Sequence, residues 1–435
     1  MRLSLSYLVA PAHIVALQKT IQAGTGFITA VLVTIFLSPE EQGYFFTMGS
    51  LLSSYTLLDL GLSSLLVQVS ARYFSGLEWG KNGELGPVNT QKSNFLALVH
   101  WTVRWYTFAG FATLMLAPIG YAYFYFAKTT DHVAWQLPWV AIVLSIAISM
   151  PGIGFLAILE GTGRIKTTYA LRIAHYILGA LMAWALLLSG NGLFAQAMAP
   201  VAIALVVSYW VKTQYGLLIK ACLHEESSFS WKRDLWPQHK RVAITWFSNY
   251  LFLHIPTPVV FYFVGAKAAG QMGLSMTVAN VLGAISMSWV TAITPRLTTL
   301  VAQGKFVEGR ALFRHGLLIA LLLLLLGSFF FVGLAMLVQG NDFAMRILSP
   351  GQLALLLLVF AGFHIFNALS IYFRAFKKEP LAVPNLLATV AIFIGSCLMA
   401  QNYGVTGVIG IMASAYLILS IYVVMGFLKT NPNIS

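Results

Sequence analysis

The chain has 435 residues, of which 59% are hydrophobic and only 9% are charged, and its mean hydropathy is +0.80. This much apolar surface exceeds what a soluble fold of that length can bury, so the composition predicts an all-α integral membrane protein. Two cysteines, Cys222 and Cys397, provide neither a disulfide framework nor a metal-ligand cluster.

Apolar blocks follow one another along the whole chain, broken by proline, glycine and charged residues. Each block is long enough for a helix to cross a hydrocarbon core of ~30 Å at ~1.5 Å per residue. The first block continues as a helical pattern through Lys19 to Leu37, so we expect an uncleaved first span and not a signal peptide. Twelve transmembrane helices are predicted near residues 12–37, 43–70, 96–126, 137–159, 167–189, 193–219, 242–264, 271–294, 312–338, 351–373, 382–401 and 405–428.

Charged residues divide the connections between these spans into two kinds. The odd-numbered connections are short, and the only lysines and arginines in them are Lys128, Lys267 and Arg346. The even-numbered connections are basic, as in EGTGRIK and RAFKKEP. By the positive-inside rule, the even connections and both chain termini are cytoplasmic. The net charge of +13 is therefore a topology signal that also attracts anionic membrane lipids, and no nucleic-acid partner is expected.

The longest basic connection divides the chain into six spans plus six. We expect an N-terminal six-helix lobe at 1–220, a cytoplasmic linker at 221–241 and a C-terminal six-helix lobe at 242–435. The halves resemble each other weakly, with QGYFFTMGSLL echoing GQMGLSMTVANVL. Because both halves start and end on the cytoplasmic side, the repeat is parallel. Two helical bundles with a cleft between them are typical of an alternating-access transporter, not of an enzyme.

Several segments resemble those of a known family. FLSPEEQGYFFTMGSLLSSYTLLDLGLSSLLVQVSAR resembles the segment after the first span of bacterial polysaccharide-export proteins of the O-antigen flippase type. These proteins belong to the multidrug/oligosaccharidyl-lipid/polysaccharide exporter (MOP) superfamily. AAGQMGLS at 268–275 is similar to a turn of that family, and Leu159-Glu160-Gly161 is similar to its LEG motif after the fourth span.

The resemblance implies a MATE-like fold of two six-helix lobes in the bacterial inner membrane. It also implies a flippase that moves an undecaprenyl-diphosphate-linked oligosaccharide, such as a repeat unit of O-antigen in lipopolysaccharide, from the cytoplasmic to the periplasmic leaflet. On this reading the protein is a monomeric transporter without a cofactor. Its partners would be membrane lipids, the lipid-linked oligosaccharide, and a polysaccharide polymerase with its chain-length regulator.

A diphosphate cargo requires cations inside the bundle, where a charged side chain costs about 2.5 to 3.5 kcal/mol on insertion scales unless it meets a cavity or a partner. Arg172 and His175 share one face of the predicted fifth span, and Arg can bind phosphate oxygens bidentately. The alternative for each cation is a side chain that snorkels to the inner interface. The candidate substrate-binding residues are Lys19, Arg104, Arg172 and His175.

Asp59 is the one carboxylate deep in a predicted span. It forms a stripe with Thr56 and Ser63, so we expect it to point at other helices and not at lipid. One hypothesis pairs it structurally with Lys19 or Arg104. The other has it titrate and couple transport to a proton or sodium gradient.

The second half of the chain carries polar but mostly neutral residues in its spans. Pro256 and Pro258 should bend the seventh span and are candidate gating residues. For the other polar residues, the alternative to a cavity lining is hydrogen bonding between helices. The candidate lining residues are Asn249, His254, Asn280, His364 and Asn367.

Two other functions compete with the flippase. A cation-coupled multidrug exporter of the same superfamily would share the fold but should offer carboxylates to organic cations, whereas cations outnumber carboxylates inside these spans. A membrane-embedded polysaccharide polymerase or glycosyltransferase would require a sizeable periplasmic loop with catalytic residues, which the short odd connections do not provide. The sequence also contains no nucleotide-binding loop of the Gly-x-x-x-x-Gly-Lys-Ser/Thr kind.

Overall fold

The computed structural model describes residues 5–80, 83–86, 90–127, 133–223, 230–376 and 380–429. Within these ranges the regular structure is helical, apart from an isolated bridge between Trp79 and Leu85. Ten helices among the described residues are long and apolar enough to cross a membrane. The chain is therefore a multi-pass helical membrane protein, as its composition predicted.

Contacts between Cα atoms divide the described chain into two compact units. Unit 1 comprises residues 5–37, 52–126 and 133–246, and unit 2 comprises 38–51, Ala127 and 247–429. The lobe boundaries expected from the sequence stay a prediction, and residues 224–229 of the expected linker lie outside the described residues.

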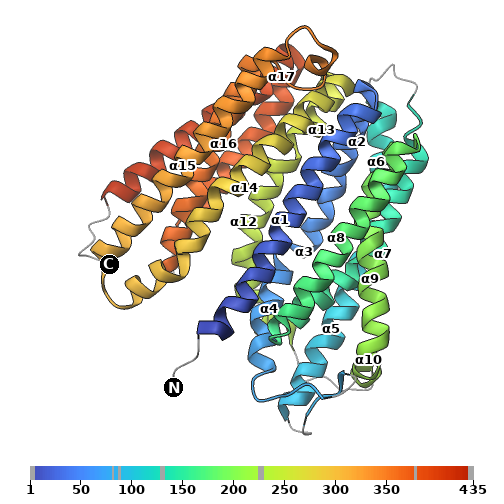
Figure 1. Ribbon diagram of the computed structural model, residues 1–435, viewed down its shortest axis with the longest axis vertical. Coiled ribbons are helices and arrows are strands. Elements are labelled where there is room, and N and C mark those ends of the chain that lie inside the picture. The colour runs from blue at the N-terminus through green and yellow to red at the C-terminus, as the bar shows by residue number, and fades with distance from the viewer. Residues whose placement is uncertain are drawn as a thin grey trace. The chain divides into compact units, whose positions relative to one another are not determined.

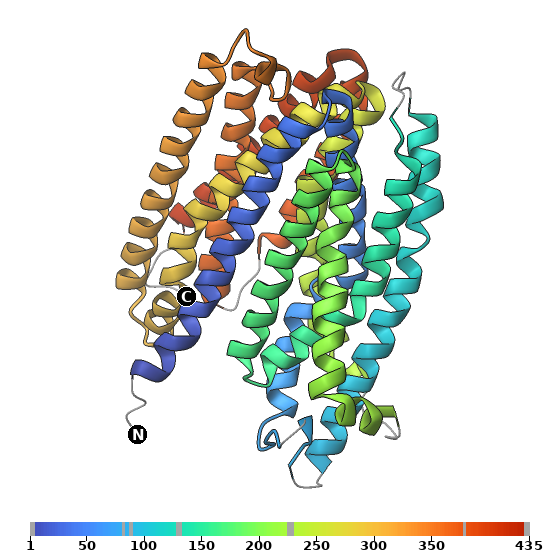
Figure 2. The ribbon, with the colours of Figure 1, turned by 45° about the vertical axis from the view of Figure 1, so that its right-hand side comes forward.

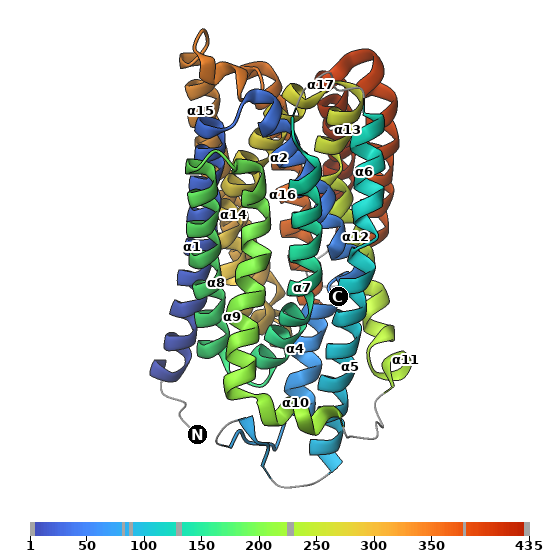
Figure 3. The same ribbon diagram turned by 90° about the vertical axis from the view of Figure 1, so that its right-hand side faces the viewer.

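Unit 1 is a bundle of long helices. Its helices are α1 (Leu5–Phe36), α3 (Thr56–Asp59), α4 (Leu62–Tyr73), α5 (Thr90–Thr113), α6 (Leu116–Phe126), α7 (Gln136–Gly161), α8 (Ile165–Leu188), α9 (Met198–Gln214), α10 (Gly216–Leu223) and α11 (Trp231–Asp234), with the first part of α12 (Trp236–His254). The helix α1 packs on α8 (Figure 2), while α4, α5 and α9 pack on α7 (Figure 3). At one end of this bundle, buried apolar side chains that include Phe95, Ile158 and Leu218 form its core.

Unit 2 contains long helices that run alongside one another (Figure 1). These are α14 (Ala266–Ala302), α15 (Phe306–Leu337), α16 (Pro350–Ala375) and the element labelled α17 (Ala382–Lys429), which consists of two helices that meet at Gly404; α2 (Pro39–Leu52), the end of α12, and α13 (Pro256–Phe263) complete the unit. On α15, Phe329 is 76% exposed and Leu337 is 82% exposed. Such a surface suits hydrocarbon and not water.

Within unit 2, α2 and the start of α14 meet through small residues and one amide. A Cβ atom built on Gly43 would lie 1.9 Å from the carbonyl oxygen of Ala266, so only glycine permits this approach. The buried Gln42 side chain donates 2.9 Å hydrogen bonds to the carbonyls of Gly270 and Arg346. The SPEEQG and AAGQMGLS segments, noted for their family resemblance, therefore pack against each other.

The predicted second and third spans are not single helices. The span at 43–70 is interrupted at Leu60 and Gly61, which both have positive φ (40° and 79°), so the helix stops and restarts as α4. The span at 96–126 is divided into α5 and α6 by a turn at Leu114 and Met115. Hydropathy alone does not show such breaks, because residues 39–73 and 92–126 are each apolar enough to be read as one membrane span.

One other predicted span also differs from the helices observed. The span at 242–264 is divided between α12 and α13, and Pro256 begins the second helix, in agreement with the bend expected from the two prolines. The spans predicted at 382–401 and 405–428 agree with the structure: α17 consists of two helices that meet at a kink at Gly404, and the Tyr416 hydroxyl of the second donates a 3.3 Å hydrogen bond to Asn385 of the first. The count of twelve spans stays a prediction.

Candidate functional site

The strongest candidate site in unit 1 is an ion pair between α7 and α8. An Arg172 Nη2 atom lies 2.7 Å from Oε2 of Glu160, and the two side chains are 26% and 21% exposed. The Tyr169 hydroxyl donates a 2.9 Å hydrogen bond to the other carboxylate oxygen, and the Arg172 guanidinium lies over the Tyr169 ring, 4.8 Å from its centroid. The guanidinium is therefore held by two neighbouring side chains and remains partly exposed.

Local sequence explains why these side chains meet. Glu160 lies in the last turn of α7, and α8 begins only a few residues later, so Tyr169 and Arg172 return past it on the antiparallel helix. The neighbouring Gly161 lets α7 approach α4 closely, because an added Cβ would lie 2.3 Å from the carbonyl oxygen of Val67. The LEG motif thus places a carboxylate at a tightly packed helix end.

Lys19 lies near this pair. It is an exposed residue on α1 and is close enough to interact electrostatically with both Arg172 and Glu160. The α1–α8 contact that brings it there includes a 2.9 Å hydrogen bond from Nε1 of Trp184 to the Thr29 hydroxyl. We call Lys19, Glu160, Tyr169 and Arg172 the α1–α8 cluster. It contains two cations and one carboxylate, so it carries a positive formal charge.

His175 lies one turn beyond Arg172 on α8. Its side chain is 4% exposed, its ring lies 4.4 Å from that of Tyr176, and its Nδ1 atom has no hydrogen-bond partner. The structure thus places Lys19, Arg172 and His175 in one region of unit 1. Arg104, the fourth residue of the predicted cationic set, is an exposed residue on α5 without an ion-pair partner among the described residues.

Asp59 occupies the helix break between α3 and α4. Its carboxylate accepts hydrogen bonds from the backbone N–H groups of Gly61 (3.2 Å) and Ser63 (3.1 Å) and from the Ser63 hydroxyl (3.0 Å). The Tyr106 hydroxyl of α5 also donates to it. A helix N-terminus leaves free N–H donors and favours negative charge, so the carboxylate stabilises the start of α4.

These contacts correct one expectation. Of the two hypotheses for Asp59, pairing with Lys19 or Arg104 does not agree with the described structure, in which its partners are backbone groups and hydroxyls, and coupling to an ion stays a prediction. The expectation that its stripe with Ser63 turns away from lipid agrees with a residue that is 8% exposed. On α12, Nε2 of His239 lies 3.2 Å from the Asp59 carbonyl oxygen. This contact connects α12 to the helix break.

In unit 2 the predicted lining residues lie on α12, α14 and α16. His364 of α16 is 7% exposed and lies against Gly283 of α14, and neither of its ring nitrogens has a partner. His254 stacks on Tyr250 with the ring centroids 5.7 Å apart.

The predicted asparagines of unit 2 have different surroundings. The amide of Asn280 donates to the Met276 carbonyl on its own helix at 2.9 Å, whereas the buried Oδ1 atom of Asn249 has no partner. Asn367 is half-buried. These roles, and the gating role of Pro256 and Pro258, stay predictions.

Several residues of the two sites were not singled out from the sequence. Tyr106, Tyr169 and His239 carry no periodic or motif signal that separates them from other aromatic residues in apolar spans. Glu160 did have a signal, its place in the LEG motif, but its partner is 12 positions away and becomes visible only in the structure. Within the described residues, no group of three or more His, Cys, Asp or Glu side chains could hold a metal ion.

No protein-family model and no curated protein matches the sequence. Solved structures do match. An inward-facing multidrug resistance MATE family transporter of the MOP superfamily has a TM-score of 0.70 at 13% identity, with 94% of each chain covered. The lipid II flippase MurJ in an inward closed conformation has a TM-score of 0.64 at 14% identity, with 95% of this chain and 87% of that chain covered.

A third match is a MOP superfamily transporter from Pyrococcus furiosus, which is described as having a reversed polarity of its binding pocket that suggests a different function. Its TM-score is 0.55 at 14% identity, with 96% of this chain and 95% of that chain covered. The fold of this chain is therefore that of the MOP superfamily transporters, including MATE proteins and MurJ. At these sequence identities the likeness establishes the fold but not the cargo, which has to be inferred from the chemistry of the site.

Proposed function

We propose that the protein is a flippase that carries an undecaprenyl-diphosphate-linked oligosaccharide, a repeat unit for O-antigen or a related polysaccharide, across the bacterial inner membrane by alternating access. The cargo moves from the cytoplasmic to the periplasmic leaflet. The protein acts as a transporter, not as an enzyme, and a proton or sodium gradient is the candidate energy source.

The observation that carries this proposal is the excess positive charge of the α1–α8 cluster. Arg172 forms an ion pair with Glu160, and Lys19, which comes from a different helix, lies within the electrostatic influence of both without forming an ion pair among the described residues. A guanidinium keeps several N–H donors when one of them binds a carboxylate, so Arg172 can still contact phosphate oxygens. The likeness in fold to a lipid II flippase supports the same class of lipid-linked cargo.

A multidrug exporter is the second candidate, because the fold also matches MATE multidrug transporters. An organic cation would need an accessible carboxylate. Asp59 is buried and already accepts four hydrogen bonds, and Glu160 is bound to Arg172. The charges of unit 1 therefore favour an anionic cargo.

The test is flipping by the purified protein in liposomes that contain a fluorescent undecaprenyl-diphosphate-linked oligosaccharide, measured with a quencher that does not cross membranes. Each charge-assisted contact is worth about 1.5–3 kcal/mol, so Lys19→Gln and Arg172→Gln should each slow flipping at least roughly tenfold. Arg172→Lys should retain part of the rate because it keeps the charge.

Two substitutions of exposed residues outside the cluster serve as matched controls. Lys166→Gln lies on α8 and Arg314→Gln on α15, and both should flip at the wild-type rate. Wild-type rates for both Lys19→Gln and Arg172→Gln would refute the cationic site. If organic cations blocked flipping or were themselves transported, the drug-exporter alternative would gain the support instead.

A further inference from the structure

One end of unit 1 contains a small pocket that the transport proposal does not use. It has a volume of about 100 Å³ and is lined by Gly80, Gly83, Arg164, Trp210, Gln214 and Tyr215. These residues come from the segment between α4 and α5, from the turn between α7 and α8, and from the end of α9. The first two segments belong to basic connections expected on the cytoplasmic side, and the third lies near the end of the span predicted at 193–219. The pocket brings the three segments together.

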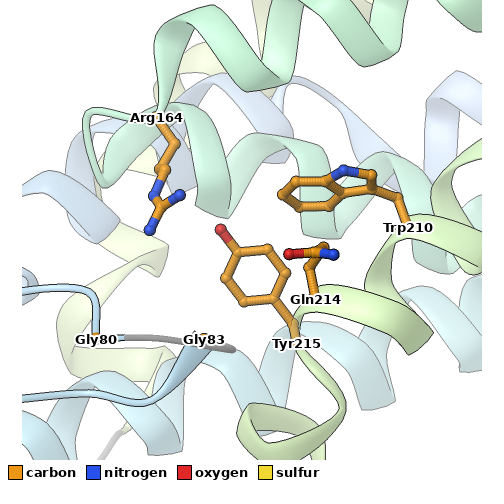
Figure 4. A pocket seen from close by; sticks show the side chains of 6 residues that line it. All are labelled: Gly80, Gly83, Arg164, Trp210, Gln214 and Tyr215. Atoms are coloured by element: carbon orange, nitrogen blue, oxygen red, sulfur yellow. The ribbon is translucent and has the colours of Figure 1, made fainter.

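Two hydrogen-bond donors directed into the pocket have no hydrogen-bond partner among the described residues. Figure 4 shows the Arg164 guanidinium and the Tyr215 hydroxyl pointing toward the same space. Tyr215 is 1% exposed, and its buried hydroxyl forms no hydrogen bond. Arg164 lies over Trp79, 5.6 Å from the ring centroid, and within the described residues it has no ion pair. A buried hydroxyl without a partner costs about 1–3 kcal/mol, so a bound group is expected to accept from it.

The surroundings hold Tyr215 in this orientation. Its ring makes edge contacts with Trp79 (centroids 5.0 Å apart) and Phe155 (5.6 Å apart), and a tilted contact with Trp210 (5.0 Å apart). Gly83, with φ of +73°, packs so closely that an added Cβ would lie 2.7 Å from Cδ1 of Tyr215. The hydroxyl is thus fixed by packing, as in a preformed binding site.

We propose that this pocket binds a single phosphate group, supplied either by the headgroup of an anionic phospholipid or as free inorganic phosphate. Its lining residues include a cation and a hydroxyl donor but no carboxylate. The planar fork of arginine fits phosphate oxygens, and juxtamembrane basic sites at the cytoplasmic surface attract anionic headgroups. The pocket's volume of about 100 Å³ suits a small group such as a single phosphate.

The experiment measures binding and thermal unfolding of the full-length protein, purified in neutral detergent. The probes are inorganic phosphate, short-chain phosphatidylglycerol and short-chain phosphatidylcholine, with chloride at equal ionic strength as the salt control. We expect phosphate or phosphatidylglycerol to raise the Tm of the wild-type protein, whereas phosphatidylcholine and chloride do not. Arg164→Gln and Tyr215→Phe should each weaken that binding roughly tenfold or more, because each loses a charge-assisted hydrogen bond.

Tyr215→Phe keeps the ring packing and removes a hydroxyl without a protein partner, so without ligand it should unfold at or above the wild-type temperature. The matched controls are Tyr209→Phe, whose ring is 73% exposed on α9, and Arg314→Gln. A response to phosphatidylglycerol that inorganic phosphate does not reproduce identifies the lipid as the source, and the reverse identifies free phosphate. Equal binding by wild type, Arg164→Gln and Tyr215→Phe, or no response to either probe, overturns the proposal.

Discussion

At the residue scale, Asp59 shows how a carboxylate is accommodated within a predicted membrane span. It lies where the helix stops, and it supplies acceptors to the N–H groups of Gly61 and Ser63 and to the Tyr106 hydroxyl. Each buried donor left without an acceptor costs about 1–3 kcal/mol. We therefore expect Asp59→Ala to lower the free energy of unfolding by about 3–5 kcal/mol and Tyr106→Phe by about 1–2 kcal/mol, measured by denaturant titration in detergent.

Tyr125→Phe is the matched control for Tyr106→Phe, because the Tyr125 side chain is 69% exposed on α6. It should leave stability unchanged within about 0.5 kcal/mol. If Asp59→Ala unfolded at the wild-type denaturant concentration, the carboxylate would not stabilise the break, and a role in ion coupling would become the better account of its presence.

At the element scale, the crossing of α2 and α14 depends on Gly43, whose added Cβ would collide with the backbone of Ala266. Backbone atoms cannot rotate away as a side chain can, so Gly43→Ala must separate the two helices. Overpacking of this kind costs about 1–3 kcal/mol, and we expect Gly43→Ala to reach at least the upper part of that range in a thermal or denaturant unfolding experiment.

Gly333 on α15 is the matched control in the same unit, since a Cβ there would meet nothing within 4 Å. In a helix interior alanine is preferred over glycine by about 0.5–1 kcal/mol, so Gly333→Ala should be neutral or stabilising. A Gly43→Ala protein as stable as Gly333→Ala would show that α2 does not need to approach α14 closely.

At the scale of the whole molecule, the asymmetry of basic residues predicts the orientation in the membrane. Reporter fusions after Gln42 and after Gly192 should be active as periplasmic reporters, and a fusion after Lys232 should be active as a cytoplasmic one, because lysine and arginine concentrate in the even connections. The measurement is a paired alkaline phosphatase and fluorescent-protein assay. The reversed pattern at these positions would overturn the orientation, and the phosphate pocket would then lie in the periplasm.

The sequence alone was sufficient for properties that depend on solvent and on local geometry. Apolar length predicted helices that can span a membrane, and Pro256 predicted a break in the seventh span that the structure contains. Composition and periodicity suffice here because a helix satisfies its own backbone hydrogen bonds. Whether a segment can span a membrane therefore depends on how apolar its consecutive residues are. The same reasoning placed Lys19, Arg172 and His175 on inner parts of their spans.

Only the tertiary structure decided which side chains meet. Asp59 and Tyr106 are 47 positions apart, and the phosphate pocket draws on three separate segments of the chain, so no local pattern could pair them. Arg104 is another example. It has the same charge as Arg172, but it is exposed on α5 and has no ion-pair partner among the described residues. Hydrophobicity decides whether a helix enters the membrane, whereas the rotation and packing of each helix decide which of its polar groups find partners.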